Sequence, residues 1–236
     1  MISTTKSLIK KIEDYFGMTL LTDFSYLIRG WEVFVAGMEG TGSTFVYQIV
    51  RGIGVKPKKI HHYVQSSLPK VVTYRDPRDV ICSYARRQLN HITDAEGLEY
   101  ALLQSYNELF RKKKRHEDLY RYREDPNALL IKYEEYFLGN ERDLISKLGD
   151  YFYISLDDQL INLLIDEYSL EKNISRSKDL NFDEIDEDSL IHGKHISNKG
   201  RIGGWEDILP NSLIILIKKE LNDFLVDFGY VENSNW

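Results

Sequence analysis

A glycine-rich turn directly follows a short apolar segment near the start of the chain, and this junction most constrains the fold. Residues Glu32–Ala36 read EVFVA, and Gly-Met-Glu-Gly-Thr-Gly-Ser-Thr then runs from Gly37 to Thr44. A short apolar run followed by glycines is typical of a buried strand. The segment after Gly42, STFVYQIV, fits a helix. Such a turn lets backbone N–H groups approach a phosphate, and the helix N-terminus adds a partial positive charge.

Strands and helices are predicted to alternate along the rest of the chain. Apolar runs predict strands at Lys70–Tyr74 and Ala128–Lys132. Helices are predicted from Pro77, from Leu98 to about Arg123, over Asp157–Leu170, and from Asn211 to a terminating glycine at Gly229. This alternation predicts a three-layer α/β fold, with a central, mostly parallel sheet flanked by helices and ligands beyond the carboxyl ends of the strands. We expect one domain over residues 1–236, with an N-terminal helical extension at 1–30 and a loop at 177–204.

The composition is that of an ordinary globular protein, with 42% hydrophobic and 29% charged residues. The net charge of −6 argues against general polyanion binding, so no nucleic-acid partner is expected. Cys82 is the only cysteine, which excludes an intrachain disulfide and agrees with a reducing compartment. Charges interrupt the N-terminal apolar stretches, which predicts neither a signal peptide nor a membrane span. We therefore expect a cytoplasmic protein.

The turn matches the nucleotide-binding pattern G-x4-G-K-[ST] only in part. Ser43 stands where that pattern has its lysine, which counts against an ordinary ATPase or kinase. Thr41, Ser43 and Thr44 offer hydroxyl donors to a phosphate. A plain strand-to-helix turn remains the alternative interpretation of these glycines.

A second polar group follows the Lys70–Tyr74 strand. Arg75 stands at the carboxyl end of that strand, where its planar guanidinium can hold two phosphate oxygens. Ser83 follows eight residues later, inside the predicted helix. The alternative is that Arg75 pairs with Asp76 or Asp79 and that Ser83 is a buried helix serine.

These segments resemble the sulfotransferases that use 3′-phosphoadenosine 5′-phosphosulfate (PAPS). The sequence Gly40-Thr41-Gly42-Ser43-Thr44 resembles the family's 5′-phosphosulfate loop, usually Lys/Arg-Ser-Gly-Thr-Thr. Arg75-Asp76-Pro77-Arg78-Asp79-Val80 with Ser83 is similar to the 3′-phosphate motif, in which the arginine and the serine bind that phosphate.

Two segments further along the chain extend the resemblance. Asn198-Lys199-Gly200-Arg201-Ile202-Gly203-Gly204-Trp205 is similar to the Arg-Lys-Gly-x-x-Gly-Asp-Trp motif that closes over the 3′-phosphate. Tyr133-Glu134 resembles a segment whose tyrosine contacts the adenine. The resemblance implies that Lys199, Gly200, Arg201 and Tyr133 bind the nucleotide.

The resemblance also implies a P-loop-like fold and a reaction without metal. A sulfuryl group would pass in line from PAPS to a hydroxyl or amine of a small-molecule, glycan or lipid acceptor, and adenosine 3′,5′-bisphosphate (PAP) would leave. Lys59-Ile60-His61 keeps the spacing of the family's Lys-Thr-His, which implies His61 as base and Lys59 as a cation near the sulfate. His62 is the competing base, and neighbouring side chains of an extended segment point to opposite faces.

The sequence departs from the family at Gly40, where a lysine or arginine normally bridges the leaving oxygen. Lys59 could carry more of that charge, turnover could be slow, or the protein could bind the nucleotide without transfer. Asn198 and Gly204 also depart from the third motif, where Arg201 could supply the missing guanidinium. A non-catalytic 3′-phosphoadenosine-binding module and a P-loop small-molecule kinase therefore remain as alternatives.

Overall fold

The computed structural model describes residues 23, 26, 28–88, 95–181, 184–193 and 200–236. Most of the predicted N-terminal extension lies outside these residues, and so do Lys199 and Asn198 of the third motif.

The centre of the protein is a parallel sheet of four strands in the order β2-β1-β3-β4. The strands are β1 (Val33–Gly37), β2 (Pro57–Ile60), β3 (Lys70–Tyr74) and β4 (Ala128–Lys132). The predicted parallel sheet is confirmed, and three of its strands lie within one residue of their predicted bounds. The fourth strand, β2, lies at the edge of the sheet and reads PKKI, so it lacks the apolar run by which the others were found.

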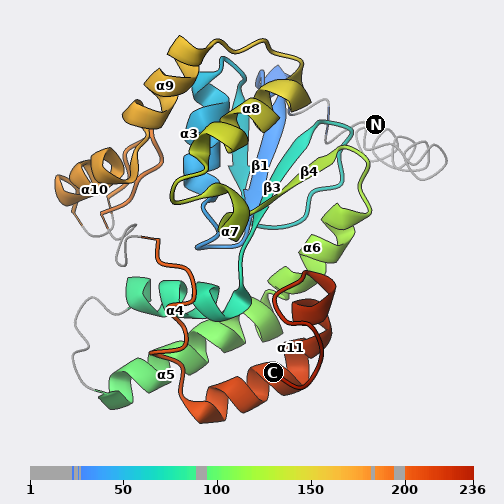
Figure 1. Cartoon of the computed structure of the whole chain (residues 1–236), viewed down its shortest axis with the longest axis vertical. Helices are drawn as coiled ribbons and strands as arrows, with labels where there is room; N and C mark the ends of the chain where they lie inside the picture. Colours follow the sequence, from blue (N-terminus) through green and yellow to red (C-terminus); the bar gives the residue numbers. More distant parts are fainter. Residues whose placement is uncertain (1–22, 24–25, 27, 89–94, 182–183, 194–199) are drawn as a thin grey trace, which may run out of the picture.

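Helices cover both faces of this sheet (Figure 1). They are α3 (Ser43–Gly52), α4 (Pro77–Gln88), α5 (Ala95–Tyr106), η1 (Asn107–Lys112), α6 (Arg115–Arg123), α7 (Tyr133–Tyr136), α8 (Glu141–Phe152), α9 (Asp158–Glu167), α10 (Leu170–Lys178) and α11 (Asn211–Asp227).

Alternate residues of the strands face two different apolar layers. Val33, Val35 and Val71 pack with α3, α8 and α9 in one cluster. Ala36 and Val72 pack with α6 and α11 in another. The period of two residues along each strand therefore produces the three-layer α/β arrangement that the sequence predicts.

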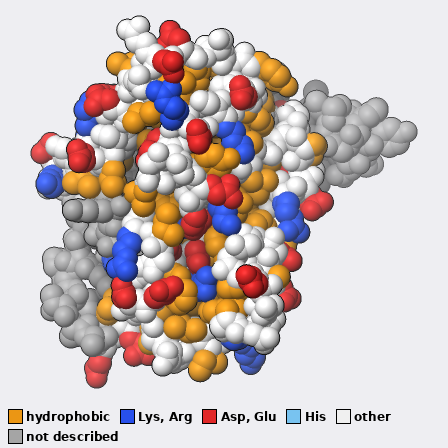
Figure 2. Space-filling model, viewed as in Figure 1, with side chains coloured by type: hydrophobic (Ala, Val, Ile, Leu, Met, Phe, Trp, Pro, Cys, Tyr) orange, Lys and Arg blue, Asp and Glu red, His pale blue; other side chains and the backbone are white. Residues whose placement is uncertain are grey.

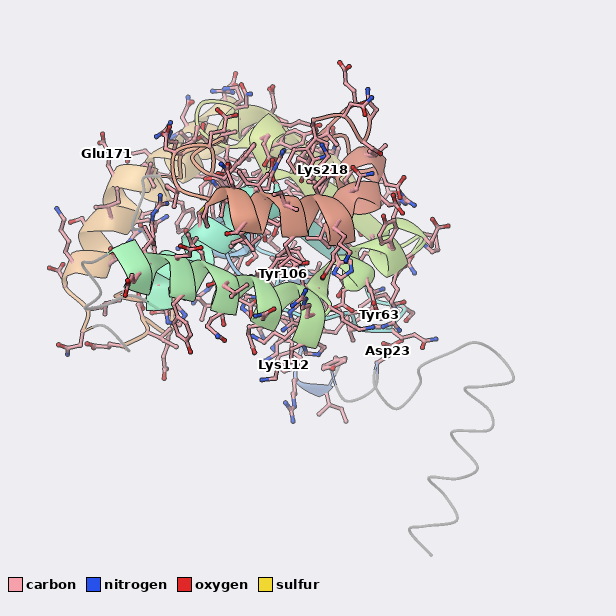
Figure 3. All side chains as sticks on the ribbon, turned by 90° about the horizontal axis from the view of Figure 1, so that it is seen from below. Asp23, Tyr63, Tyr106, Lys112, Glu171 and Lys218 are labelled. Carbon is pink, nitrogen blue, oxygen red and sulfur yellow. The ribbon has the colours of Figure 1, made fainter. Side chains whose placement is uncertain are left out.

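A third apolar cluster joins α4, α5, η1 and α11 at the end of the sheet where β3 leads into α4 (Figure 1). Tyr106 lies between α5 and α11 (Figure 3), and its hydroxyl donates to Glu220 Oε2 at 2.6 Å. This cluster fixes α4, the helix that carries the residues after Arg75.

The predicted helix from Leu98 to about Arg123 is divided into three pieces. A π-helical segment, η1, follows α5, and Lys114 adopts a left-handed φ of 51° before α6 begins. A left-handed residue cannot continue a helix, so the chain changes direction there. The basic side chains around this break therefore belong to separate elements, with Arg111 and Lys112 in η1 and Arg115 in α6.

The predicted Asp157–Leu170 helix is also divided. Asp157 caps α9 by accepting from Leu160 N–H at 2.7 Å, and a new helix, α10, begins at Leu170. Because α10 continues to Lys178, it overlaps the first two residues of the predicted 177–204 loop. Ser169 caps α10, and this serine cap is the local signal that marks the second helix.

No helix of the described ranges has the length and apolar character needed to cross a bilayer. Acidic and basic side chains are interspersed on the face seen in Figure 2. On this face positive charge is not gathered into one broad patch, in keeping with the net charge of −6.

Candidate active site

The glycine-rich loop joins β1 to α3 and lines a cavity of about 530 Å³. Gly40 and Gly42 have φ angles of 95° and 84°, which residues with a side chain rarely adopt. A Cβ atom at Gly42 would lie 2.4 Å from the Phe137 ring, so the loop is also held closely against α7 and the residue that follows it. The turn thus needs glycine at both positions.

The hydroxyl side chains of the loop divide into two groups. Ser43 and Thr44, at the start of α3, line the cavity. Thr41 is fully buried, and its hydroxyl contacts Met38 O at 2.8 Å and Thr73 Oγ1 at 2.7 Å. Its side chain therefore holds the loop against β3, and only its backbone N–H remains to serve a phosphate.

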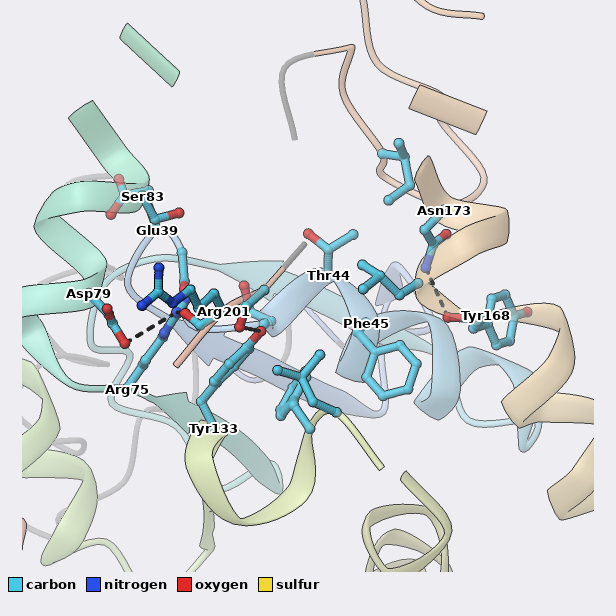
Figure 4. A pocket seen from close by; sticks show the side chains of 18 of the residues that line it. Glu39, Thr44, Phe45, Arg75, Asp79, Ser83, Tyr133, Tyr168, Asn173 and Arg201 are labelled. Carbon is cyan, nitrogen blue, oxygen red and sulfur yellow. Dashed lines mark hydrogen bonds and ion pairs between the residues drawn. The ribbon is translucent and has the colours of Figure 1, made fainter. Parts of the chain in front are cut away.

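Arg75 crosses the cavity floor from the end of β3 (Figure 4). Its Nη2 lies 3.4 Å from Asp79 Oδ2, and its Nη1 donates to the Gly40 carbonyl at 3.3 Å. The guanidinium carbon lies 4.2 Å from the centre of the Tyr133 ring, while Nε is buried without a hydrogen-bond partner. Arg75 thus does pair with Asp79, yet it keeps a buried donor unsatisfied.

Ser83 and Asp79 lie on α4 beside the loop (Figure 4). Asp76 caps the helix that the sequence predicts from Pro77, because its carboxylate accepts from the Arg78 N–H at 2.9 Å. Asp79 and Ser83 are four residues apart, so α4 presents both to the cavity.

The third motif folds over Arg75. Gly200, with φ 73°, accepts from the Tyr133 hydroxyl at 2.9 Å, and the Arg201 carbonyl accepts from Arg75 Nη2. Gly203 N–H donates to Asp79 Oδ2 at 2.8 Å. The Arg201 side chain is paired with Asp207 at 2.7 Å and is more than half exposed, although Arg201 also lines the cavity.

Lys59 and His61 approach the loop from the end of β2. Lys59 Nζ donates to Thr44 Oγ1, and His61 Nδ1 lies 2.8 Å from the Gly37 carbonyl oxygen. Both side chains line the cavity. His62 is exposed and does not line it; its carbonyl accepts from the Tyr122 hydroxyl at 2.9 Å. The two neighbouring histidines therefore lie in different surroundings.

Burial shifts the protonation of both groups. It lowers the pKa of His61, an effect that the Gly37 hydrogen bond opposes and the charge of Lys59 reinforces. Burial, together with the charge of Arg87, lowers the pKa of Lys59 to about 7, against the opposing charge of Glu39. His61 is therefore neutral at pH 7. Since a carbonyl only accepts, Nδ1 carries the proton and Nε2 keeps its lone pair.

Glu39 and Arg87 are among the charged residues of the cavity that sequence reasoning missed. Glu39 pairs with Lys113 at 3.1 Å, and Arg87 Nη2 donates to Ser83 Oγ at 3.2 Å. A signal for Arg87 was present, because it follows Ser83 by four residues on one helix and therefore shares its face. For Glu39 the sequence contained no such signal apart from its position in the glycine-rich loop.

Aromatic side chains line the cavity on the side of α3, α7 and α9. Phe45 and Phe137 have ring centroids 5.4 Å apart, and Tyr133 stacks on Phe137 at 4.3 Å. Tyr168 and Asn173 close this side from the end of α9 and from α10 (Figure 4). The cavity thus has an aromatic part and a cationic part. Within the described ranges no group of three His, Cys, Asp or Glu side chains forms a metal-binding cluster.

Residues 55–222 match the family model described as the sulfotransferase domain, which is more than half of the chain. Comparison with curated proteins gives no match. The solved structure of mouse sulfotransferase SULT7A1 complexed with PAP has a TM-score of 0.63 and 14% identity, covering 83% of this chain and 84% of that one. Retinol dehydratase in complex with androsterone and the inactive cofactor PAP has a TM-score of 0.60 and 18% identity, covering 83% and 80%. At identities this low, the two solved structures show a likeness of fold alone. That fold is the three-layer, P-loop-like architecture that the sequence predicts. Because the match extends from the residues before β2 into α11 and includes Lys59, His61 and Arg75, it leads to one conclusion: the chain belongs to the sulfotransferase domain family.

Proposed function

We propose that this sulfotransferase moves a sulfuryl group from PAPS to a hydroxyl or amine of a small-molecule, glycan or lipid acceptor, with His61 as the base. The observation that carries the proposal is the meeting of the glycine-rich loop, Arg75, Lys59 and His61 in one cavity. The volume of about 530 Å³ falls in the range of small-molecule sites. PAP in both structural relatives supports the choice of donor.

In this proposal the donor lies across the cavity. The adenine takes the aromatic side, where Phe45 and Tyr168 offer stacking surfaces. The 3′-phosphate takes the place beside Arg75 and Ser83, with the backbone of Gly200 and Arg201 above it. The unsatisfied Arg75 Nε supports this assignment, because a buried guanidinium donor needs an acceptor.

The phosphosulfate then takes the place at the N-terminus of α3. The backbone N–H groups of Gly42 and Ser43 lie at the start of α3, where a helix offers donors to an anion, and Lys59 contacts Thr44 there. The sulfuryl group would come close to His61, on the same side of the loop. Arrangement by backbone donors and cations is how enzymes position an anionic group for in-line displacement.

His61 Nε2 accepts the proton of the acceptor as its oxygen or nitrogen forms a bond to sulfur. The bond between sulfur and the bridging oxygen breaks at the same time, and PAP leaves with that electron pair. Lys59 stabilises the growing charge. The Gly37 carbonyl fixes the tautomer that this step needs, because it accepts the Nδ1–H hydrogen bond, with Nδ1 and the oxygen 2.8 Å apart.

The acceptor would approach His61 from the side opposite the leaving phosphate. The retinol dehydratase structure contains androsterone, which supports a small-molecule acceptor. We expect no metal in the reaction, since the cations that face the donor come from the protein. Transfer and PAP binding should both survive EDTA.

Calorimetric titration with PAP, AMP and ATP tests the proposal without the acceptor. We expect PAP to bind at least 10-fold more tightly than AMP, since each charge-assisted contact to the 3′-phosphate adds on the order of 1.5–3 kcal/mol. Equal affinity for PAP and AMP would contradict the donor assignment. Tighter binding of ATP with Mg²⁺ would favour the kinase alternative instead.

A further inference from the structure

Arg87 occupies the space above Gly40. A Cβ atom built on Gly40 would lie 3.0 Å from Arg87 Nη2 and 3.2 Å from Ser83 Oγ. The Gly40 φ of 95° also disfavours a side chain there. The loop therefore has no cation of its own at this point, and a guanidinium from the third turn of α4 stands at the same place.

The Arg87 side chain has no acidic partner within ion-pair distance among the residues that the structure describes. Its Nε is buried and makes no hydrogen bond, and its Nη2 reaches only the neutral Ser83 hydroxyl at 3.2 Å. The neighbouring cations differ, because Arg75 pairs with Asp79 and Lys113 pairs with Glu39. Arginine keeps its charge even when burial lowers its pKa, as it does here.

Arg87 and Lys59 act on the same part of the cavity. The charge of Arg87 is the second cause, after burial, of the lowered Lys59 pKa. Lys59 in turn contacts Thr44, in the first turn of α3. Both cations line one cavity, and the charge of Glu39 offsets their repulsion only in part, so their arrangement favours an anionic ligand between them.

We propose that Arg87 supplies the cation that the glycine-rich loop lacks, and that its guanidinium contacts the 5′-phosphate of the donor beside the S–O bond that breaks. This inference rests on the proposed function. The electron pair of that bond passes to the bridging oxygen, which becomes a 5′-phosphate oxygen of PAP. Arg87 stays protonated throughout and offsets the charge that develops, in concert with Lys59.

Two adenosine ligands, PAP and adenosine 3′-monophosphate, distinguish binding of the 5′-phosphate by Arg87 from binding of the 3′-phosphate. PAP and adenosine 3′-monophosphate share the 3′-phosphate and differ only in the 5′-phosphate. Titration of each into the wild type and Arg87→Met therefore measures the coupling between Arg87 and the 5′-phosphate. We expect Arg87→Met to weaken PAP binding at least 10-fold and adenosine 3′-monophosphate binding less than about 3-fold. Arg87→Lys should restore most of the lost PAP affinity.

Lys112→Met is the matched control. It also removes one positive charge, yet Lys112 is 76% exposed, pairs with Glu108 and does not line the cavity. Its affinity for both ligands should equal that of the wild type. Circular dichroism and the melting temperature check the fold of each variant, and Arg87→Gln replaces Arg87→Met if the latter does not fold.

Equal losses for both ligands would overturn the proposal and assign Arg87 to the 3′-phosphate together with Ser83. Unchanged affinities would also overturn it and leave Arg87 a structural role. In both cases PAP still binds the wild type, so the proposed function stands. Failure of the wild type to bind PAP would overturn the proposed function and this inference together.

Discussion

Asp79 Oδ2 accepts a hydrogen bond from the Gly203 N–H at 2.8 Å, across a separation of 124 residues. The same carboxylate accepts from the Trp205 N–H at 3.1 Å and pairs with Arg75 at 3.4 Å. One buried side chain on α4 therefore joins the arginine at the end of β3 to the segment that folds over it. In the free protein, Asp79 partly neutralises the cation that we assign to the 3′-phosphate.

Asp79→Asn should destabilise the free protein by about 2–4 kcal/mol, because it removes one charge of a buried pair and leaves Arg75 without its carboxylate. Thermal unfolding measures the loss. PAP should raise the melting temperature more in this variant than in the wild type, since the ligand's phosphate restores an anion beside Arg75.

The control for this variant is Asp207→Asn. The Arg201–Asp207 pair is 2.7 Å long, but its side chains are 57% and 62% exposed, so removing it should cost less than about 1 kcal/mol. Equal melting temperatures for Asp79→Asn and the wild type would contradict the structural role given to Asp79.

Gly42→Ala should lower stability more than Gly54→Ala, although both glycines have a left-handed φ, of 84° and 91° respectively. A Cβ at Gly54 would meet nothing within 4 Å, whereas one at Gly42 would lie 2.4 Å from Phe137 Cζ. Gly54→Ala therefore reports the backbone strain alone, about 1–3 kcal/mol. Overpacking against Phe137 should add a further 1–3 kcal/mol or so at Gly42.

Chemical denaturation of both variants gives this difference in the free energy of unfolding. Titration with PAP should then show weakened binding only for Gly42→Ala, because only that loop faces the cavity. Similar stability and affinity in the two variants would mean that the loop does not need the close approach to Phe137.

The sequence predicted the sheet because β1, β3 and β4 are apolar runs whose burial can be read locally. It also predicted the strand-to-helix junctions, because Gly42 and Asp76 mark them by backbone and capping preferences. Arg87 and Glu39 escaped prediction because their roles depend on which elements meet in space. The spacing of four residues places Arg87 on the same helix face as Ser83, but the distance from Arg87 to Gly40 is set by the packing of α4 against α5 and α11, which the spacing does not show. Strand β2 also escaped prediction, because this edge strand is polar and has no apolar run. The break at Lys114 escaped prediction because a single left-handed residue does not change the periodicity of the sequence around it.

His61→Ala should lower kcat by about 10²–10⁴-fold and leave PAP affinity nearly unchanged. His62→Ala is the matched control and should change kcat little, because His62 is exposed and does not line the cavity. Steady-state kinetics with an acceptor found by screening gives both values. A larger loss in His62→Ala than in His61→Ala would show that the base is assigned one residue too early.

The pH profile gives a second test of His61. The base works in its neutral form, and burial lowers the pKa of His61 below its ordinary value of 6.5. The rate should therefore hold from neutral pH down to about 6.5 and fall only at lower pH. A rate that already falls at pH values above 7 as the solution is made more acidic would contradict a neutral His61.

Lys59 should take up a proton when PAP binds at pH 8. Burial, and then the charge of Arg87, lower its pKa to about 7 in the free protein, so most Lys59 side chains are neutral at pH 8. The phosphates of PAP are already ionised at that pH, their second pKa being about 6, and they favour the charged ammonium. Binding should therefore draw close to one proton from the buffer. At pH 6, where Lys59 is already charged, this uptake should disappear.

Titration calorimetry in two buffers with different ionisation enthalpies measures the uptake, because the observed heat changes in proportion to the protons that the buffer releases. Lys59→Met should abolish the dependence on the buffer at pH 8. His61→Ala should retain it, since burial lowers the pKa of His61 in the free protein and Lys59 is still present in that variant. Arg87→Met should reduce the uptake, because loss of that charge raises the Lys59 pKa and leaves more Lys59 protonated before PAP binds. A buffer dependence that persists in Lys59→Met would place the titrating group elsewhere in the cavity.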